Sequence, residues 1–242
     1  TDTVLGAVSG IIDNIFSLEL FQQIGESLLK GAANILDAES MSVWKDVDGI
    51  LNADPKVFPD AVQIAELNYL DTIELAYSGA QIIHPKTIKP LQNKNIPLYV
   101  RPFGDKRKPG TVIRRMSAPI EVPILILKKD QVLLTIRSRD FSFVLEEKFA
   151  AIFSLLERYR IKVNLVHNSA VNLSLCVDNS WHIDEAIQAL RNEEFDVMKV
   201  ENMELLTIRG YNGDLMERYA SGPEVFLLQR TQSTARIVRK NR

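Results

Sequence analysis

The spacing of apolar residues along the chain alternates between the period of a helix and that of a strand, and it defines most of the expected elements. The first forty residues predict a short strand over residues 3–8 and a helix over residues 27–36. Farther on, the pattern predicts a strand over 42–44, helices over 59–65, 69–78 and 86–94, and strands over 96–101 and 111–113. Gly79 suits the position just after a helix, because a residue with positive φ often ends a helix there.

Residues 117–123 contain two prolines and interrupt this pattern, which indicates a domain boundary. We therefore expect one domain over residues 1–117 and a second part over residues 118–242. The second part is predicted to contain strands over 124–128, 131–137, 163–167, 171–177, 197–200, 204–209, 224–229 and 234–239, with helices over 145–159, 183–191 and 214–219. Such β-α-β-β units are typical of ferredoxin-like modules. The second unit is short, so we expect one module to borrow elements from the other.

Composition narrows the class of protein. A chain of 242 residues with 46% hydrophobic and 25% charged residues fits one large globular domain or two of ordinary size. The net charge of −2 argues against an electrostatic nucleic-acid binder, and no stretch has the length and purity of a membrane span. Cys176 is the single cysteine and falls in an apolar strand, which favours an inert core thiol. The first residues lack the basic start of a signal peptide, and we expect a cytoplasmic protein.

Two segments carry candidate chemistry. Residues 45–56 read Lys-Asp-Val-Asp-Gly-Ile-Leu-Asn-Ala-Asp-Pro-Lys, and residues 78–85 read Ser-Gly-Ala-Gln-Ile-Ile-His-Pro. In an α/β protein, a loop that leaves the carboxyl end of a strand is a usual place for a ligand. Carboxylates and cations in such a loop suit phosphoryl transfer, which needs positioning and charge neutralisation. The alternative interpretation is a solvated turn that its aspartates stabilise.

Together the two segments resemble aspartate kinases of the amino-acid kinase superfamily. The resemblance implies an α/β fold, with a partial amino-acid kinase α/β/α sandwich followed by two ferredoxin-like (βαββαβ) ACT domains. It implies phosphorylation of the aspartate side-chain carboxylate with ATP and Mg²⁺. Lys45 and Asp46 match the family's Thr-Asp pair beside the nucleotide, and Lys56 matches a basic residue that faces the phosphates. Leu51 and Gln81 match nucleotide-side positions where many members carry a tyrosine and a lysine.

The front of the family's pattern is missing. The chain contains no Lys-Phe-Gly-Gly-Thr string, and residues 24–29 replace the glycine-rich turn that precedes the motif loop in the family. Catalytic residues are therefore not assigned, and this polypeptide is expected to show little or no kinase activity. A fragment, a natural deletion and separate segments joined together remain open. The histidines lack metal-ligand spacing, so no resident metal site is expected.

The second part of the chain contains a candidate effector site. Free backbone amides near the start of the helix at residue 145 suit the carboxylate of a small amino acid. By resemblance to lysine-sensitive aspartate kinases, the effector lies between ACT modules. The candidate residues are Ser138, Phe141, Ser142, Asn164, Asn168, Ser169 and Val171. Asn164 stands where the family has an acidic residue for the effector amine, which leaves lysine and threonine both open. Ordinary connecting loops are the alternative interpretation.

The resemblance implies a feedback-regulated enzyme of lysine, threonine and methionine biosynthesis that forms a homodimer through its ACT domains. No nucleic-acid or membrane partner is expected, because of the net charge and the lack of a membrane-length apolar stretch. The competing hypothesis is a non-catalytic, amino-acid-sensing ACT regulatory protein. A superfamily kinase acting on glutamate or a nucleotide is the third. The sequence leaves open the oligomeric state and a second enzyme fused to the same protein.

Overall fold

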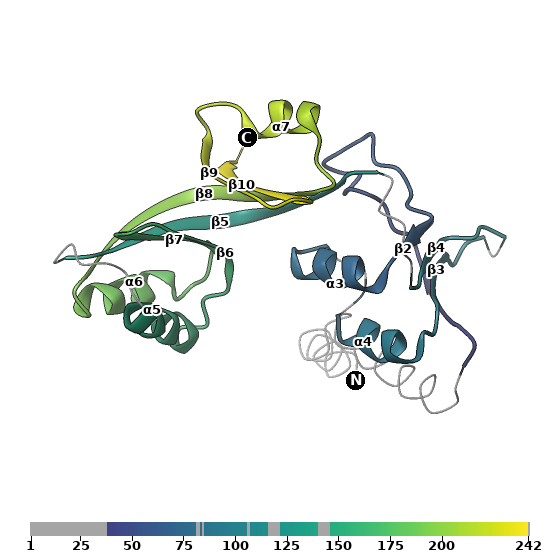
Figure 1. Cartoon of the computed structure of the whole chain (residues 1–242), viewed down its shortest axis with the longest axis horizontal. Coiled ribbons are helices and arrows are strands. Elements are labelled where there is room, and N and C mark those ends of the chain that lie inside the picture. Colours follow the sequence, from purple (N-terminus) through teal and green to yellow (C-terminus); the bar gives the residue numbers. More distant parts are fainter. Residues whose placement is uncertain are drawn as a thin grey trace, which may run out of the picture. The chain divides into compact units, whose positions relative to one another are not determined.

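The computed structural model describes residues 38–80, 83, 85–105, 107–115, 122–139 and 146–241 (Figure 1). The chain divides into two compact units, with the boundary between Glu121 and Val122. Each unit has its own sheet with helices, so the α/β fold class is confirmed. The strand and helix expected over residues 3–8 and 27–36 lie outside the described residues. In the described part, no helix has the length and apolar character needed to cross a membrane.

The first unit contains a four-stranded mixed sheet in the order β1-β3-β4-β2. Its strands are β1 (Met41–Lys45), β2 (Glu66–Leu67), β3 (Leu98–Pro102) and β4 (Thr111–Ile113). Between them in sequence lie helices α3 (Tyr69–Tyr77) and α4 (Pro85–Lys94). Leu67, Leu75, Ile88, Leu91, Leu98 and Ile113 are among the fully buried side chains of this unit. Helix α3 ends as expected, because Gly79 adopts a φ of 113° just after it.

The helix predicted over residues 59–65 is wrong. This segment is extended and runs beside residues 50–52, with the Asn52 amide donating to the Val62 carbonyl at 2.9 Å and the Ile64 amide donating to the Ile50 carbonyl at 2.8 Å. Val62 is exposed and Ile64 is buried, which is the alternation of a strand. Pairing with residues 50–52 therefore outweighs the local helical spacing.

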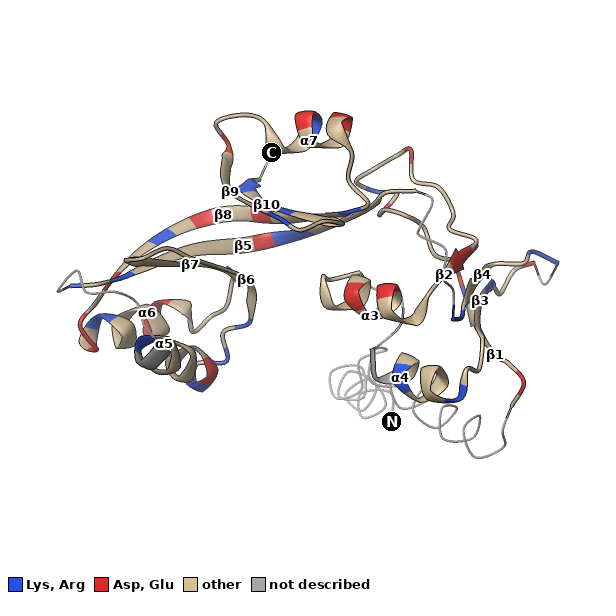
Figure 2. Ribbon diagram, viewed as in Figure 1, with Lys and Arg blue, Asp and Glu red and all other residues tan. Residues whose placement is uncertain are grey.

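The second unit contains a six-stranded sheet in the order β6-β7-β5-β8-β10-β9, and its described pairings are antiparallel. The strands are β5 (Ile124–Ser138), β6 (Val163–Asn168), β7 (Asn172–Asp178), β8 (Phe195–Arg209), β9 (Val225–Arg230) and β10 (Thr234–Lys240). Two pairs of predicted strands are thus single long strands, β5 and β8. Each contains one residue with positive φ, Asp130 in β5 and Asn202 in β8, and the register of the β5–β8 pairing shifts there. Charged residues mark this part of both strands (Figure 2).

The long strands are shared by two modules. The first module uses the later half of β5, helix α5 (Glu146–Arg158), β6, β7, helix α6 (Ile183–Asn192) and the earlier half of β8. The second uses the later half of β8, helix α7 (Gly213–Ala220), β9, β10 and the earlier half of β5. Both modules therefore have the same strand order, and the second borrows the start of β5 as its last strand. This exchange of elements is the one that we expected because the second β-α-β-β unit is short.

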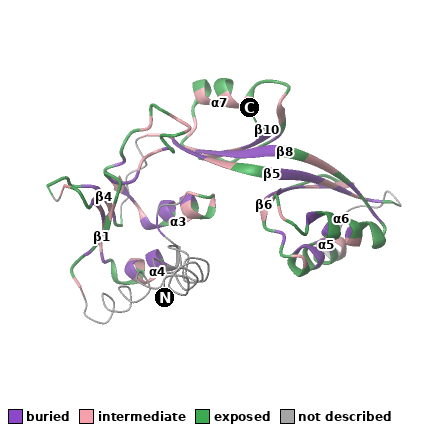
Figure 3. Cartoon of the chain, turned by 180° about the vertical axis from the view of Figure 1, so that it is seen from behind, coloured by how far each residue is buried: buried purple, intermediate pink, exposed green. Residues whose placement is uncertain are grey.

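The second unit has two clusters of buried apolar side chains, and Figure 3 shows the buried positions along β5 and β8 and on α5 and α6. One cluster lies under α5 and α6 and includes Leu134, Ile136, Ile152 and Leu190. The other joins the two modules, since it combines first-module and second-module side chains. Its buried members are Leu133, Leu165, Cys176, Met203, Leu205, Leu227 and Val238. The sheet of each module thus contributes one face to a common core.

Candidate functional site

The candidate nucleotide loop begins where two parallel strands end. Lys45, the last residue of β1, is in register with Pro102, the last residue of β3. The loops that follow these strands, residues 46–64 and 103–110, therefore leave the same edge of the sheet. The Phe103 amide donates to the Lys45 carbonyl at 2.6 Å, which joins the two loops where they begin. This carboxyl edge is the place where open α/β sheets usually bind ligands.

A buried threonine fixes the inner part of the loop. The Thr111 hydroxyl at the start of β4 accepts a hydrogen bond from the Ile50 amide at 2.8 Å. The same hydroxyl donates to the Ile64 carbonyl at 2.6 Å. Thr111 is completely buried, so both contacts form away from water, where leaving either group unpaired is costly. The path of the loop is thereby tied to the sheet.

Gly49 makes the close approach of the two loops possible. Its φ is +152°, and a Cβ at this position would lie 2.6 Å from Gln63 Nε2 and 2.8 Å from Thr111 Oγ1. Gln63 Nε2 instead donates to the Asp48 carbonyl at 3.1 Å and to the Gly110 carbonyl at 2.9 Å. A glycine is therefore required here, because any side chain would displace this amide bridge between the loops.

The structure places Lys45 at the end of β1 and three more of the five predicted nucleotide-side residues on the loop that follows. Lys45 is half-buried at the end of β1, and Asp46 is exposed directly after it. Leu51 is half-buried, and Lys56 is exposed at the far end of the loop. Gln81 lies outside the described residues. The loop thus presents two lysines and an aspartate at the carboxyl edge of the sheet, and their roles stay predictions.

Two further residues near this edge, Lys108 and Arg101, were not predicted from the sequence. Lys108 Nζ lies 2.7 Å from Asp48 Oδ2, so the loop after β3 adds a third lysine to the edge. The signal was the density of charge between two glycines at positions 104–110. Arg101 on β3 stacks over the rings of Trp44 and Tyr99, at 5.9 and 4.8 Å from their centroids. Within the described part of the chain, no group of three or more His, Cys, Asp or Glu is arranged to hold a metal ion.

The predicted effector residues of the second unit divide into two places. Ser138 ends β5, and the preceding residue is in register with Asn172, the first residue of β7. Ser138 therefore lies beside the turn that contains Ser169 and Val171. In that turn, the Ser169 amide donates to the Asn172 carbonyl at 2.8 Å, and the Ser169 hydroxyl accepts from the Asn172 amide at 3.2 Å. Asn168 is exposed at the end of β6.

Ser138 is buried, and its hydroxyl accepts a hydrogen bond from Lys148 Nζ on α5 at 2.7 Å. The contact joins the end of β5 to the first turns of the helix that follows it. Phe141 and Ser142, which were predicted to complete this site, lie outside the described residues. The structure therefore brings Ser138, Ser169 and Val171 to one end of the first module.

Asn164 lies near the other end of β6, in a polar network. Its amide nitrogen donates to Asp178 Oδ1 and to Gln131 Oε1, both at 2.7 Å. Its oxygen accepts from Lys128 Nζ at 2.9 Å, and the same ammonium lies 2.7 Å from Asp178 Oδ1. Lys128 belongs to the part of β5 that the second module borrows. Asn164 therefore takes part in holding the modules together, at a distance from the turn that contains Ser169.

This network controls two pKa values. Burial raises the pKa of the Asp178 carboxyl, but hydrogen bonds from Lys128, Gln131 and Asn164 outweigh it and hold the pKa below its usual value. Burial, with the negative charge of Asp178, raises the pKa of the Cys176 thiol to about 12. Cys176 is thus a buried, protonated thiol, as expected from its apolar strand.

Comparisons with known proteins support the interpretation of both units. The profile of the Amino acid kinase family matches residues 31–102. The chain is 36% identical over 152 residues to aspartokinase 3, chloroplastic, of Arabidopsis thaliana, covering 60% of this chain and 26% of that protein. It is 31% identical over 202 residues to lysine-sensitive aspartokinase 3 of Escherichia coli K12, covering 80% of this chain and 44% of that protein.

A solved structure gives the same result. The crystal structure of E. coli aspartokinase III in complex with lysine and aspartate superposes with a TM-score of 0.67 at 26% identity. The match covers 85% of this chain and 49% of that one. In each of these comparisons, the chain spans less than half the length of the protein that it matches. The similarity extends over most of this chain, across both of its units.

Proposed function

We propose that this chain, which is related to the aspartokinases of the amino acid kinase family and matches part of their length, forms the nucleotide-side portion of an aspartate kinase together with its paired ACT sensor. The proposal is carried by the family match over residues 31–102. This range contains the parallel strands β1 and β3 and the loop of residues 46–64 that follows β1. Residues 1–117 would belong to the kinase part and residues 118–242 to the sensor.

The proposed reaction transfers the γ-phosphoryl group of ATP to the side-chain carboxylate of aspartate. Such a transfer depends on positioning and on neutralising the phosphate charge. Lys45, Lys56 and Lys108 supply positive charge at the carboxyl edge of the first sheet, and Asp46 is exposed beside them. These residues would hold the nucleotide, and its Mg²⁺ would help to neutralise the phosphate charge. The stacked Arg101 and the Thr111 contacts would keep the edge rigid.

Nucleotide binding provides the first test. We expect Mg·ADP to bind the chain measurably in isothermal titration calorimetry. Lys56→Ala should weaken binding by about tenfold, the loss expected for one charged hydrogen bond to a phosphate. Lys89→Ala, which removes the same charge from an exposed position on α4, is the matched control and should have no effect. Absence of Mg·ADP binding, or equal effects of both variants, would refute the nucleotide assignment.

The sensor is proposed to bind lysine or threonine at the end of the first module that contains Ser138 and Ser169. Calorimetry with lysine and then threonine, at fixed pH and salt, identifies the effector. Ser169→Ala should weaken the binding. Thr231→Ala is the matched control, because the Thr231 hydroxyl accepts from the Thr234 amide at 3.1 Å in the corresponding turn of the second module. Equal affinities of the two variants would place the effector elsewhere.

In the parent enzyme, effector binding would shift a two-state equilibrium, and the coupling between effector and substrate must be reciprocal. We further propose a homodimer formed through the ACT modules, which sedimentation velocity would test. If the chain is a monomer and still binds the effector as tightly as expected, the effector site does not depend on a contact between ACT modules of two subunits.

The second candidate function is a non-catalytic, amino-acid-sensing regulatory protein. The departures of Lys45, Leu51 and Gln81 from the residues that many aspartate kinases carry at these nucleotide-side positions favour it. The two candidates are separated by hydroxylamine trapping of aspartyl phosphate with the full chain, ATP, Mg²⁺ and aspartate. We expect little or no product from this polypeptide, and appreciable product would refute that expectation. Effector binding without nucleotide binding would favour the regulatory protein over the kinase portion.

A further inference from the structure

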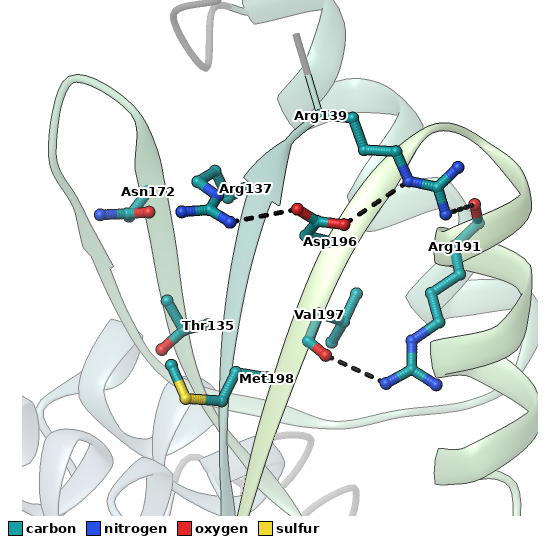
Figure 4. A pocket seen from close by; sticks show the side chains of 8 residues that line it. All are labelled: Thr135, Arg137, Arg139, Asn172, Arg191, Asp196, Val197 and Met198. Atoms are coloured by element: carbon teal, nitrogen blue, oxygen red, sulfur yellow. Dashed lines mark hydrogen bonds and ion pairs between the residues drawn. The ribbon is translucent and has the colours of Figure 1, made fainter. Parts of the chain in front are cut away.

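An open pocket of about 400 Å³ lies on the first module, across the ends of β5, β7 and β8 (Figure 4). It adjoins the end of the module that contains Ser138 and Val171, but no described candidate effector residue lines it. Three of its lining side chains are arginines from three elements. Arg137 comes from β5, Arg139 follows that strand, and Arg191 lies in the last turn of α6.

The pocket is locally positive in a chain whose net charge is −2. Among the lining residues that the structure describes, one carboxylate, that of Asp196, stands against the three arginines. Glu194, which is not a lining residue, lies 3.4 Å from Arg139 and offsets part of that arginine's charge. The balance of the lining is therefore two positive charges, and such a concave surface attracts anions.

Asp196 holds two of the guanidinium groups in place. Its carboxylate lies 3.1 Å from Arg137 Nη2 through one oxygen and 3.5 Å from Arg139 Nε through the other. Arg139 Nη2 also donates to the Arg191 carbonyl at 3.0 Å. Each guanidinium has five N–H groups, so these contacts orient the arginines while leaving capacity for a ligand. The cost of ordering them on binding is thereby reduced.

The remaining walls add polar and apolar contacts. Thr135 and Asn172 bring a hydroxyl and an amide from β5 and β7, and Met198 brings a thioether that is 62% exposed. The volume lies toward the lower end of the range for small-molecule sites. The pocket can thus hold a whole metabolite, with its anionic group on the arginines and its body against Met198.

We propose that this pocket binds a small metabolite through a phosphoryl group. A dianionic phosphoryl group balances the two positive charges of the lining, and the guanidinium fork matches phosphate oxygens in pairs. Small dicarboxylates share part of this chemistry and serve as the comparison ligand. The inference concerns the second unit alone and does not depend on nucleotide binding or kinase activity.

The test is calorimetry of the full chain with inorganic phosphate and with malonate, at constant ionic strength maintained with chloride. Met198→Glu and Met198→Gln form the matched pair, because they have the same shape and differ in charge. Met198 is exposed, so neither change disturbs the core. Met198→Glu should weaken phosphate binding by about tenfold or more, since a carboxylate among the arginines opposes the ligand charge. Met198→Gln should keep the affinity within about threefold of the parent.

The affinities for phosphate and malonate, in the parent and in the two variants, decide whether the pocket binds a phosphoryl group. Saturable phosphate binding that is tighter than malonate binding and is lost only in Met198→Glu supports the proposal. Absence of saturable phosphate binding overturns it. Equal affinity in the two variants also overturns it, because the phosphate would then bind elsewhere. Tighter binding of malonate overturns the phosphoryl assignment.

Discussion

The second module contains a buried ion pair whose removal gives a quantitative test of the structure. Arg239 Nε on β10 lies 2.7 Å from Glu204 Oε1 on β8, and the two side chains are 6% and 4% exposed. The Arg239 guanidinium also stacks over the Tyr219 ring, 5.5 Å from its centroid, at the end of α7. The pair therefore joins two strands and a helix at one point of the core.

Glu204→Gln keeps the shape of the side chain but leaves the Arg239 charge buried without a countercharge. Breaking a buried pair in this way costs about 3–5 kcal/mol. Since about 1.4 kcal/mol corresponds to a factor of ten, the opening equilibrium of the second unit should rise at least about 100-fold. Replacing both partners by apolar residues, Glu204→Leu with Arg239→Met, should come close to the parent in stability, because it removes both desolvation penalties.

Cys176 reports the opening of this unit within the intact chain. It is the single cysteine and is buried in the core shared by the two modules. Its thiol reacts with an alkylating reagent only when the unit opens, and the rate follows the opening equilibrium when reclosing is faster than labelling. The labelling rates of parent, single and double variants in low urea therefore give the free-energy differences directly.

Asp184→Asn is the matched control, because it makes the same carboxylate-to-amide change in an exposed ion pair with Lys199. Surface pairs contribute about 0–1 kcal/mol, so the control should change the labelling rate by less than about fivefold. The reasoning is refuted if Glu204→Gln labels no faster than Asp184→Asn. It is also refuted if the apolar double variant opens as readily as the single variant.

Three further outcomes are expected. Gly110→Ala would place its Cβ against the Val100 carbonyl at a φ of +71°, whereas the Cβ of Gly104→Ala meets nothing within 4 Å. Circular dichroism should therefore show a melting temperature lower by about 4 °C or more for Gly110→Ala but not for Gly104→Ala. Equal melting temperatures of the two variants would contradict this. At about pH 8.5 the folded Cys176 thiol, with its pKa of about 12, should react with iodoacetamide at least about tenfold more slowly than the same thiol unfolded in urea. Equal rates would show that the strand is accessible and would contradict this. The pKa of Asp178 is lower in the folded state than the unfolded value of about 3.9, so its carboxylate contributes stability above about pH 3.9 that is lost as the pH falls through the folded pKa. Asp178→Asn should therefore flatten the acid side of a plot of the urea midpoint against pH. An unchanged plot would count against the network.

The elements that the sequence predicts well are those whose pattern is local. Helix α6 was expected over residues 183–191 and is found at Ile183–Asn192, with its apolar positions buried at helical spacing. β4 was expected over residues 111–113 and is found there. The fusion of short strands into β5 and β8 was not predictable, because the polar residues around Asp130 resemble a turn. Pairing between the two long strands overrides that local signal.

The site was less predictable than the fold because its contacts join distant residues. The loop that begins at Lys45 was found from its composition. Its partner Lys108 lies sixty residues beyond Asp48 in the sequence, and nothing local links the two. Asn164 shows the same limit in the second unit. Its type and position predict an effector contact, which stays a prediction. The hydrogen bonds that its amide nitrogen donates to Asp178 and Gln131 in the structure could not be foreseen from the local sequence.

The sharing of β5 and β8 has a consequence for how the second unit responds to any ligand. Cys176 belongs to the first module by its strand, yet it packs with Met203, Leu205 and Val238 of the second. Opening one module therefore exposes the apolar face of the other and removes half of a central strand from its sheet. The two modules should unfold as one cooperative unit, which is why a change at Glu204 in one module can be read at Cys176 in the other. A ligand that stabilises either module must, by the same linkage, stabilise both.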